Sequence, residues 1–268
     1  MNGAAIDRLS DELGSELAIM KGRVDGLEAR VNGIEAGSFS ETTTMKGKAK
    51  FMIGGTDGVS DEAVSAAYFW EVDLNTSFTG EDNLNVEIET GNTPSSTDNF
   101  LAVTDFGKDS GDVLKVSDIN YTFPLGGWSI TVGDSLDASK QFTGACSYGN
   151  TVDALSDCGT GNSIAVGGDQ SISAGYDLDN GFSFGLGISA EDGEKADKGM
   201  FTAEGEDIYA LNVAYSGDNY GLALAYADVD VATYWGINAS YSPDGFPTIS
   251  GGYEFGDPDT GNDTTCLL

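Results

Sequence analysis

From Lys46 onward the chain repeats one pattern, in which about ten residues alternate apolar and polar side chains and then meet a turn. Short turns such as 216–219 and 242–245 are mostly separated by longer loops rich in Gly, Asp and Ser. Strands with one apolar and one polar face, joined by short turns at one end and long loops at the other, are typical of an antiparallel transmembrane β-barrel. We therefore expect a mainly β fold.

Turn residues bound eleven predicted strands in this region. Residues 68–78 give the clearest strand, because Trp70 and Val72 face one way while Glu71 and Asp73 face the other. The predicted strands are 46–54, 68–78, 84–89, 113–123, 128–134, 170–178, 182–190, 207–215, 220–227, 231–241 and 246–255. The long loops between them are 93–112, 135–169 and 191–205.

A period of two does not say whether the apolar face points into a soluble core or toward lipid. Strands of about nine to eleven residues match one tilted crossing of a bilayer. Aromatic residues gather near the strand ends, as an interfacial girdle requires; examples are Tyr68, Phe78, Trp128, Tyr220, Tyr241 and Tyr253. We therefore expect the apolar face to meet lipid and the polar face to line a lumen.

The chain of 268 residues has 44 acidic and 12 basic side chains, and it contains no histidine. Binding of nucleic-acid phosphates depends on Lys/Arg patches, so the acidity argues against a nucleic-acid partner. The lack of histidine removes the commonest general base and the commonest zinc ligand. The acidic stretch 257–263 does not match an EF-hand calcium loop. We predict that the chain is not an enzyme and holds no cofactor or metal.

Residues 5–36 carry apolar side chains at heptad spacing, which predicts a coiled-coil helix over residues 1–36. Its core positions are Leu13, Leu17, Met20, Val24, Leu27, Val31 and Ile34. Residues at flanking positions pair with opposite charge, as in Glu16–Lys21, which suits a parallel coil. The alternative is a single amphipathic helix that packs on the barrel. Residues 37–45 are predicted as a linker, and residues 46–268 as the barrel, present in part.

The three cysteines are Cys146, Cys158 and Cys266. Twelve positions separate the first two within a loop rich in Gly, Ser and Asp. Either these two form a disulfide in an oxidising compartment or they are two unpaired small residues. The long segment that holds them, 135–169, has the length to fold into a lumen and narrow it.

The polar faces of the first three predicted strands supply the expected pore lining. These residues are Lys46, Lys48, Lys50, Glu71, Asp73, Asn75, Glu87 and Glu89. The carboxylates would favour cations, and the lysines would form a basic ladder. We expect the acidic and the basic walls to oppose each other across the lumen. The alternative is that the lysines merely neutralise neighbouring carboxylates.

Four stretches carry a resemblance to a known family. Residues 16–31 (ELAIMKGRVDGLEARV) are similar to the coil that precedes the barrel in that family, and residues 42–51 (TTTMKGKAKF) to its first strand. Residues 75–80 (NTSFTG) and 121–127 (YTFPLGG) are similar to its periplasmic turns. The chain thus resembles cyanobacterial outer-membrane porins of the carbohydrate-selective, OprB-type family, which carry an SLH domain.

The resemblance implies a homotrimeric channel in outer-membrane lipid, with its coil in the periplasm, through which ions and small solutes diffuse passively. Peptidoglycan contact would depend on the family's SLH domain, which is absent from this sequence. An odd count of eleven strands should not close a barrel, since bacterial single-chain barrels have even numbers. We therefore expect a fragment or a shortened relative. A competing expectation is a trimeric structural or adhesive fibre whose apolar strand faces are buried between chains.

Overall fold

The computed structural model describes residues 16, 20–24, 26, 42–55, 64–92, 110–146, 157–202 and 205–267. The chain divides into two compact units, Met1–Thr44 and Met45–Leu268. Nearly all of the described structure lies in the second unit, which is β-sheet.

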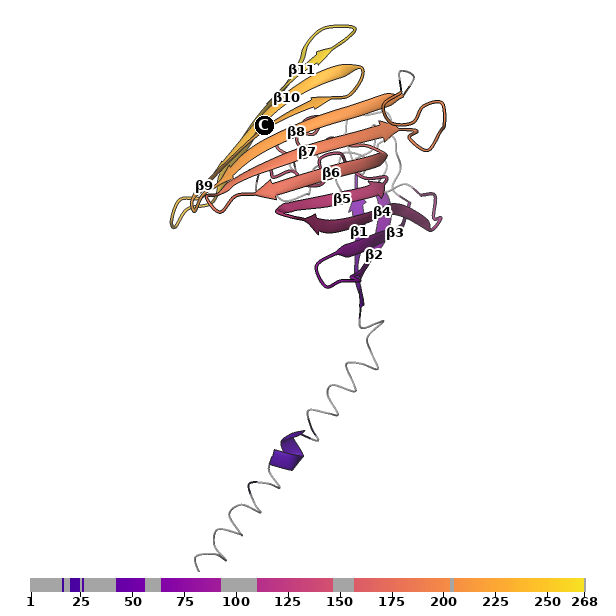
Figure 1. Ribbon diagram of the computed structural model, residues 1–268, viewed down its shortest axis with the longest axis vertical. Helices are drawn as coiled ribbons and strands as arrows, with labels where there is room; N and C mark the ends of the chain where they lie inside the picture. The colour runs from indigo at the N-terminus through magenta and orange to yellow at the C-terminus, as the bar shows by residue number, and fades with distance from the viewer. Residues whose placement is uncertain are drawn as a thin grey trace, which may run out of the picture. The chain divides into compact units, whose positions relative to one another are not determined.

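In the part of the chain that the structure describes, twelve strands form one antiparallel sheet, in which each strand lies beside the next along the chain (Figure 1). The strands are β1 (Thr43–Gly54), β2 (Ser65–Thr76), β3 (Asn83–Gly91), β4 (Lys115–Leu125), β5 (Trp128–Asp134), β6 (Gln170–Asp177), β7 (Phe182–Glu191), β8 (Glu206–Ser216), β9 (Tyr220–Asp228), β10 (Ala232–Tyr241), β11 (Ile249–Pro258) and β12 (Thr264–Leu267). This up-and-down order confirms the predicted mainly β fold.

The prediction of eleven strands is wrong, because the structure has a further strand, β12, after the last predicted one. After a turn, β12 pairs back along β11, with Cys266 opposite Glu254. Four residues are too few to show a period of two, so this strand forms because the edge of β11 offers partners for its backbone. β11 itself begins at Ile249, three residues later than predicted. Pro247 lies in the predicted part and cannot donate a ladder hydrogen bond.

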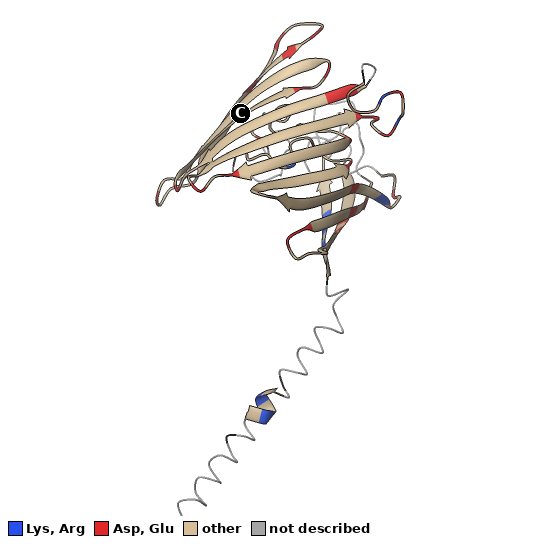
Figure 2. Cartoon of the chain, in the orientation of Figure 1, with Lys and Arg blue, Asp and Glu red and all other residues tan. Residues whose placement is uncertain are grey.

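Many large apolar side chains of the sheet are exposed and many polar ones are buried, which is the reverse of the arrangement in a soluble protein. In β8, Leu211 and Val213 are exposed while Asn212 between them is buried. In β10, Trp235 and Ile237 are exposed while Asn238 is buried. In β6 to β9 the charged residues lie at the strand ends (Figure 2). The apolar face therefore points outward and the polar face inward, which confirms the predicted direction of the faces.

The turn between β2 and β3 is locked by one carboxylate. Oδ1 of Asp82 accepts hydrogen bonds from the backbone N–H of Phe78 (2.9 Å) and of Thr79 (2.7 Å), and from the Ser77 hydroxyl (2.8 Å). Its Oδ2 accepts one from the Tyr121 hydroxyl at 2.6 Å. These donors, Tyr121 foremost, hold the pKa of Asp82 well below its usual range.

In the first unit, the described residues 16, 20–24 and 26 are helical. Of the predicted coil core, Met20 and Val24 are described, and both side chains are exposed. The other core positions, Leu13, Leu17, Leu27, Val31 and Ile34, lie outside the described residues. Within the described part of the chain, no helix has the length and apolar character needed to cross a membrane.

Candidate pore-lining site

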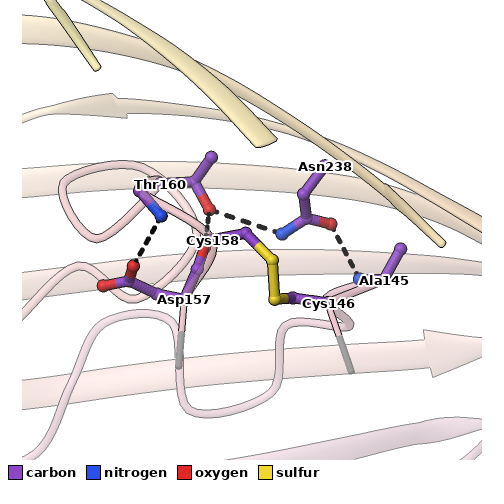
Figure 3. The surroundings of a disulfide bond; sticks show 7 residues. Ala145, Cys146, Asp157, Cys158, Thr160 and Asn238 are labelled. Atoms are coloured by element: carbon purple, nitrogen blue, oxygen red, sulfur yellow. Dashed lines mark hydrogen bonds between the residues drawn. A yellow bond between two sulfur atoms is a disulfide. The ribbon is translucent and has the colours of Figure 1, made fainter. Parts of the chain in front are cut away.

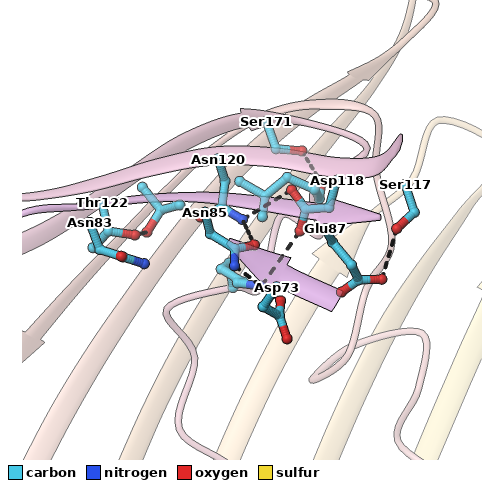
Figure 4. Close-up of polar contacts among 12 residues, drawn as sticks. Asp73, Asn83, Asn85, Glu87, Ser117, Asp118, Asn120, Thr122 and Ser171 are labelled. Carbon is cyan, nitrogen blue, oxygen red and sulfur yellow. Dashed lines mark hydrogen bonds and ion pairs between the residues drawn. The ribbon is translucent and has the colours of Figure 1, made fainter. Parts of the chain in front are cut away.

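The inner faces of β2, β3 and β4 form a surface that we call the polar wall (Figure 4). The amide of Asn85 donates to Oδ1 of Asp73 at 3.0 Å and to Oδ1 of Asn75 at 3.2 Å. The amide of Asn120 donates to Oδ1 of Asn85 at 3.3 Å and to Oδ1 of Asp118 at 3.0 Å. These bonds, of which the one from Asn120 to Asp118 lies within β4 and the others join neighbouring strands, hold a row of amide and carboxylate groups on the inner face.

Acidic side chains face one another directly across β2 and β3. Glu71 is paired with Glu89 and Asp73 with Glu87 in the strand register. Carboxylate oxygens of Glu71, Glu87 and Glu89 lie within 4.8 Å of one another. Like charges at such positions repel, so the cluster needs compensation. Nζ of Lys48 provides part of it, 2.6 Å from Oε1 of the buried Glu71.

The lysine ladder lies beside this acidic cluster and not across the lumen from it. β1, which carries the lysines, is the neighbour of β2 in the sheet. Nζ of Lys48 and of Lys50 lie 5.6 and 5.9 Å from the centre of the Phe69 ring on β2. This corrects the expectation of opposed walls, because consecutive strands of a meander share one wall. Local compensation, the alternative, fits the Lys48–Glu71 pair.

The segment between β5 and β6, residues 135–169, lies against the inner faces of β6 to β11 in its described part. We call this part the inward segment and the surface beneath it the covered wall. The backbone N–H of Gln141 donates to Oγ of Ser173 at 3.0 Å, and that of Asp169 donates to Oγ of Ser189 at 2.9 Å. Ala138 of the segment packs with Ala210 and Ala227 of the wall.

The covered wall is built of small residues because the inward segment approaches it closely. A Cβ atom on Gly187 would lie 2.0 Å from the carbonyl oxygen of Ala138. A Cβ atom on Gly185 would lie 2.5 Å from the ring of Phe142. Larger side chains at these two positions would push the segment off the wall.

Three long polar side chains interrupt this small-residue surface, and each binds the inward segment. Oδ1 of Asn212 accepts from the backbone N–H of Thr143 at 2.9 Å. Oε2 of Glu254 accepts from the Ser163 hydroxyl at 2.6 Å. Asn238 binds two parts of the segment at once (Figure 3). All three side chains are buried.

Cys146 and Cys158 of the inward segment are joined by a disulfide, with their Cα atoms 5.9 Å apart (Figure 3). The sequence alone left this pairing open. Cys266 is free and exposed. An open cavity of ≈ 790 Å³ lies between the segment and β10 to β12, and Asp157, Asn162 and Glu254 are among its lining residues.

Sequence reasoning missed Asn212, Asn238 and Glu254, although a signal was present. Each stands between two small residues on the inner face of its strand. The flanking pairs are Ala210 and Ala214, Gly236 and Ser240, and Gly252 and Gly256. A lone long polar residue within a small-residue face indicates a group that reaches over its neighbours to hold a covering segment.

Comparison with known proteins agrees with this architecture. The sequence profile of the OprB family of carbohydrate-selective porins matches residues 2–204. The uncharacterized protein alr4550 of Nostoc sp. (strain PCC 7120) is 26% identical in an alignment of 255 residues that covers 83% of this chain and 44% of that protein. The chain thus spans less than half the length of this relative.

Solved structures resemble the sheet as well. Two mutants of the porin from Rhodopseudomonas blastica match with TM-scores of 0.52 and 0.53, at 13% and 14% identity. In both cases the match covers 84% of this chain and 78% of the porin chain. At such identity the likeness concerns the fold alone. The family profile covers most of the sequence, and the chain therefore belongs to the OprB family of carbohydrate-selective porins.

Proposed function

We propose that the protein acts as an outer-membrane porin, a passive diffusion channel for inorganic ions and small hydrophilic solutes, with sugars as the solute class that the family suggests. The observation that carries the proposal is the inversion of the sheet. Large apolar side chains such as Leu211, Trp235 and Ile237 are exposed, while the adjacent Asn212 and Asn238 are buried. Exposed apolar side chains in this number would make a soluble protein aggregate, whereas lipid is their natural environment.

The polar wall supports a path for cations and neutral solutes. Its amides from Asn85 and Asn120 offer hydrogen-bonding groups of the kind that can replace solute hydration. Its carboxylates, Glu71, Asp73, Glu87, Glu89 and Asp118, outnumber the three lysines of β1 together with Lys115 of β4. An excess of negative charge in a lumen attracts cations and repels anions.

The proposed assembly is a homotrimer with the N-terminal helix as a periplasmic coiled coil. Met20 and Val24 are exposed by 62% and 51% in the described helical residues. Exposed apolar residues at heptad core positions support burial against other copies of the chain.

The experiment is to refold the protein in detergent, test for heat-resistant trimers on gels and record conductance in planar bilayers. We expect stepwise conductance increments, which the same sample should lose after boiling. Sugar uptake by liposomes that contain the protein would extend the test to neutral solutes. A protein that stays soluble without detergent and gives no conductance would contradict the proposal and favour the fibre.

A further inference from the structure

Asn238, in the middle of β10, lies where the two limbs of the inward segment meet (Figure 3). Its Oδ1 accepts a hydrogen bond from the backbone N–H of Ala145 at 2.8 Å, in the limb that leaves β5. Its Nδ2 donates to Oγ1 of Thr160 at 3.3 Å, in the limb that returns to β6. The side chain is 1% exposed, so these partners replace the water that the amide would otherwise bind.

Around Asn238, glycines on the inner face leave room for the returning limb to lie directly on the strands. A Cβ atom on Gly236 would lie 2.0 Å from Oγ of Ser163. A Cβ atom on Gly252, on the neighbouring strand, would lie 2.5 Å from the carbonyl oxygen of Cys158. The returning limb therefore rests directly on the backbone of β10 and β11, and Asn238 is the long side chain that rises beside it.

The disulfide fastens the same junction. Cys146 follows Ala145, whose N–H binds Asn238, and Cys158 precedes Thr160 by two residues. One fastening is covalent and joins limb to limb. The other consists of hydrogen bonds and joins both limbs to the barrel wall. At this junction the limbs separate from each other and from the wall only when both fastenings are released, while Asn212 and Glu254 bind the segment at other points.

We propose that Asn238 is a positioning residue that holds both limbs of the inward segment at one level of the lumen and thereby sets the channel width, with the Cys146–Cys158 disulfide as a parallel fastening. The effect on channel width rests on the proposed porin function. The fastening itself does not, since it follows from contacts that exist in the isolated protein.

The first test measures how fast the two cysteines react with a maleimide in detergent after a phosphine reductant is added. A Cys266→Ser background restricts the signal to Cys146 and Cys158. Asn238→Leu keeps the size of the side chain and removes both hydrogen bonds, so we expect labelling to be about tenfold faster. Thr160→Val removes the acceptor of Nδ2, along with its own bond to the Asp157 carbonyl, and should give a smaller increase.

Asn219→Ala, in the exposed turn between β8 and β9, is the matched control and should label at the starting rate. Heat-induced mobility shifts on gels check that every variant is folded. Labelling of Asn238→Leu at the same rate as the control would overturn the proposal, because Asn238 would then not hold the limbs.

The second test records single-channel conductance before and after reduction. The protein with Asn238 intact should keep its conductance after reduction, and Asn238→Leu should keep it while oxidised. After reduction, Asn238→Leu should become noisier and rise about twofold, because both fastenings are gone. Equal conductance of the reduced variant and the reduced starting protein would overturn the proposal. If no variant forms a channel, the porin function fails, and with it the role in channel width, while the labelling rates still decide the fastening.

Discussion

The polar wall and the covered wall are built on the same alternation of inward and outward residues, yet their inner faces differ. In the polar wall the inward residues are long and bond to one another across strands, as Asn85 does to Asp73. In the covered wall they are small and bond to the inward segment, as Ser173 does to Gln141. The alternation thus tells which face is inside, and the size of the inward residues tells what lies on that face.

The difference has an energetic reason. A connecting segment that lies on the inner face buries backbone N–H and C=O groups, which must find partners. Ser171, Asn212 and Asn238 supply such partners from the covered wall, the first as a donor to the Leu136 carbonyl. In the described part of the polar wall, the inward side chains bond to one another across the strands instead.

We expect the largest effect on conductance when the inward segment, which lies on the covered wall, is deleted. Deletion of residues 140–165 should raise single-channel conductance several-fold, because the inward segment lies on the inner face of the strands and in the proposed channel would occupy part of the lumen. Deletion of residues 194–200, in the connection between β7 and β8, is the control of the same kind. Planar-bilayer recordings check both deletions, and equal conductance would show that the inward segment does not narrow the channel.

A single substitution can test the close approach of segment and wall. Gly187→Val places side-chain atoms where the Ala138 carbonyl lies and should lower the free energy of unfolding by about 1–3 kcal/mol. Asn83→Val, on the half-buried polar wall, should cost about 1 kcal/mol or less, since it loses one hydrogen bond. Urea-induced unfolding in detergent gives both values, and a larger loss for Asn83→Val would contradict the comparison.

The charge of the polar wall can be changed without altering the covered wall. Replacing Lys46, Lys48 and Lys50 by Gln should increase cation selectivity, because three positive charges leave the wall that holds Glu71. Reversal potentials in a salt gradient measure this change. Replacing Lys195 and Lys198, which pair with Asp192 in the β7–β8 connection, is the control. An unchanged reversal potential in the first variant would place its lysines outside the ion path.

The smallest effect concerns the turn below the polar wall. Because hydrogen bonds lower the pKa of Asp82 from 3.8, its stabilising effect is present above that value and is lost as pH falls through the pKa of the folded state. Asp82→Asn should therefore lower thermal stability at neutral pH, and its difference from the unchanged protein should shrink on acidification below 3.8. Melting curves at several pH values check this, and a difference that grows in acid would contradict it.

The sequence alone determined the class of fold and most strand positions. Alternation in stretches such as 68–78 predicted strands, and turn residues such as Asn180 and Gly181 bounded them, because both signals are local. Strand length and the aromatic residues near strand ends supported the direction of the faces, and short motifs such as 75–80 supported the resemblance to the porin family. The coiled coil stays a prediction, since most of its core positions lie outside the described residues.

Only the tertiary structure decided how distant residues meet. β12 forms only because the edge of β11 offers backbone partners, and the Lys48–Glu71 pair forms because β1 and β2 are neighbours. Asn238 binds a segment that is about 80 to 90 residues away in the chain. A period of two records which side of a strand a residue occupies. It does not record what is packed against that side. This packing distinguishes the covered wall, which contacts the inward segment, from the polar wall, whose side chains bond to one another.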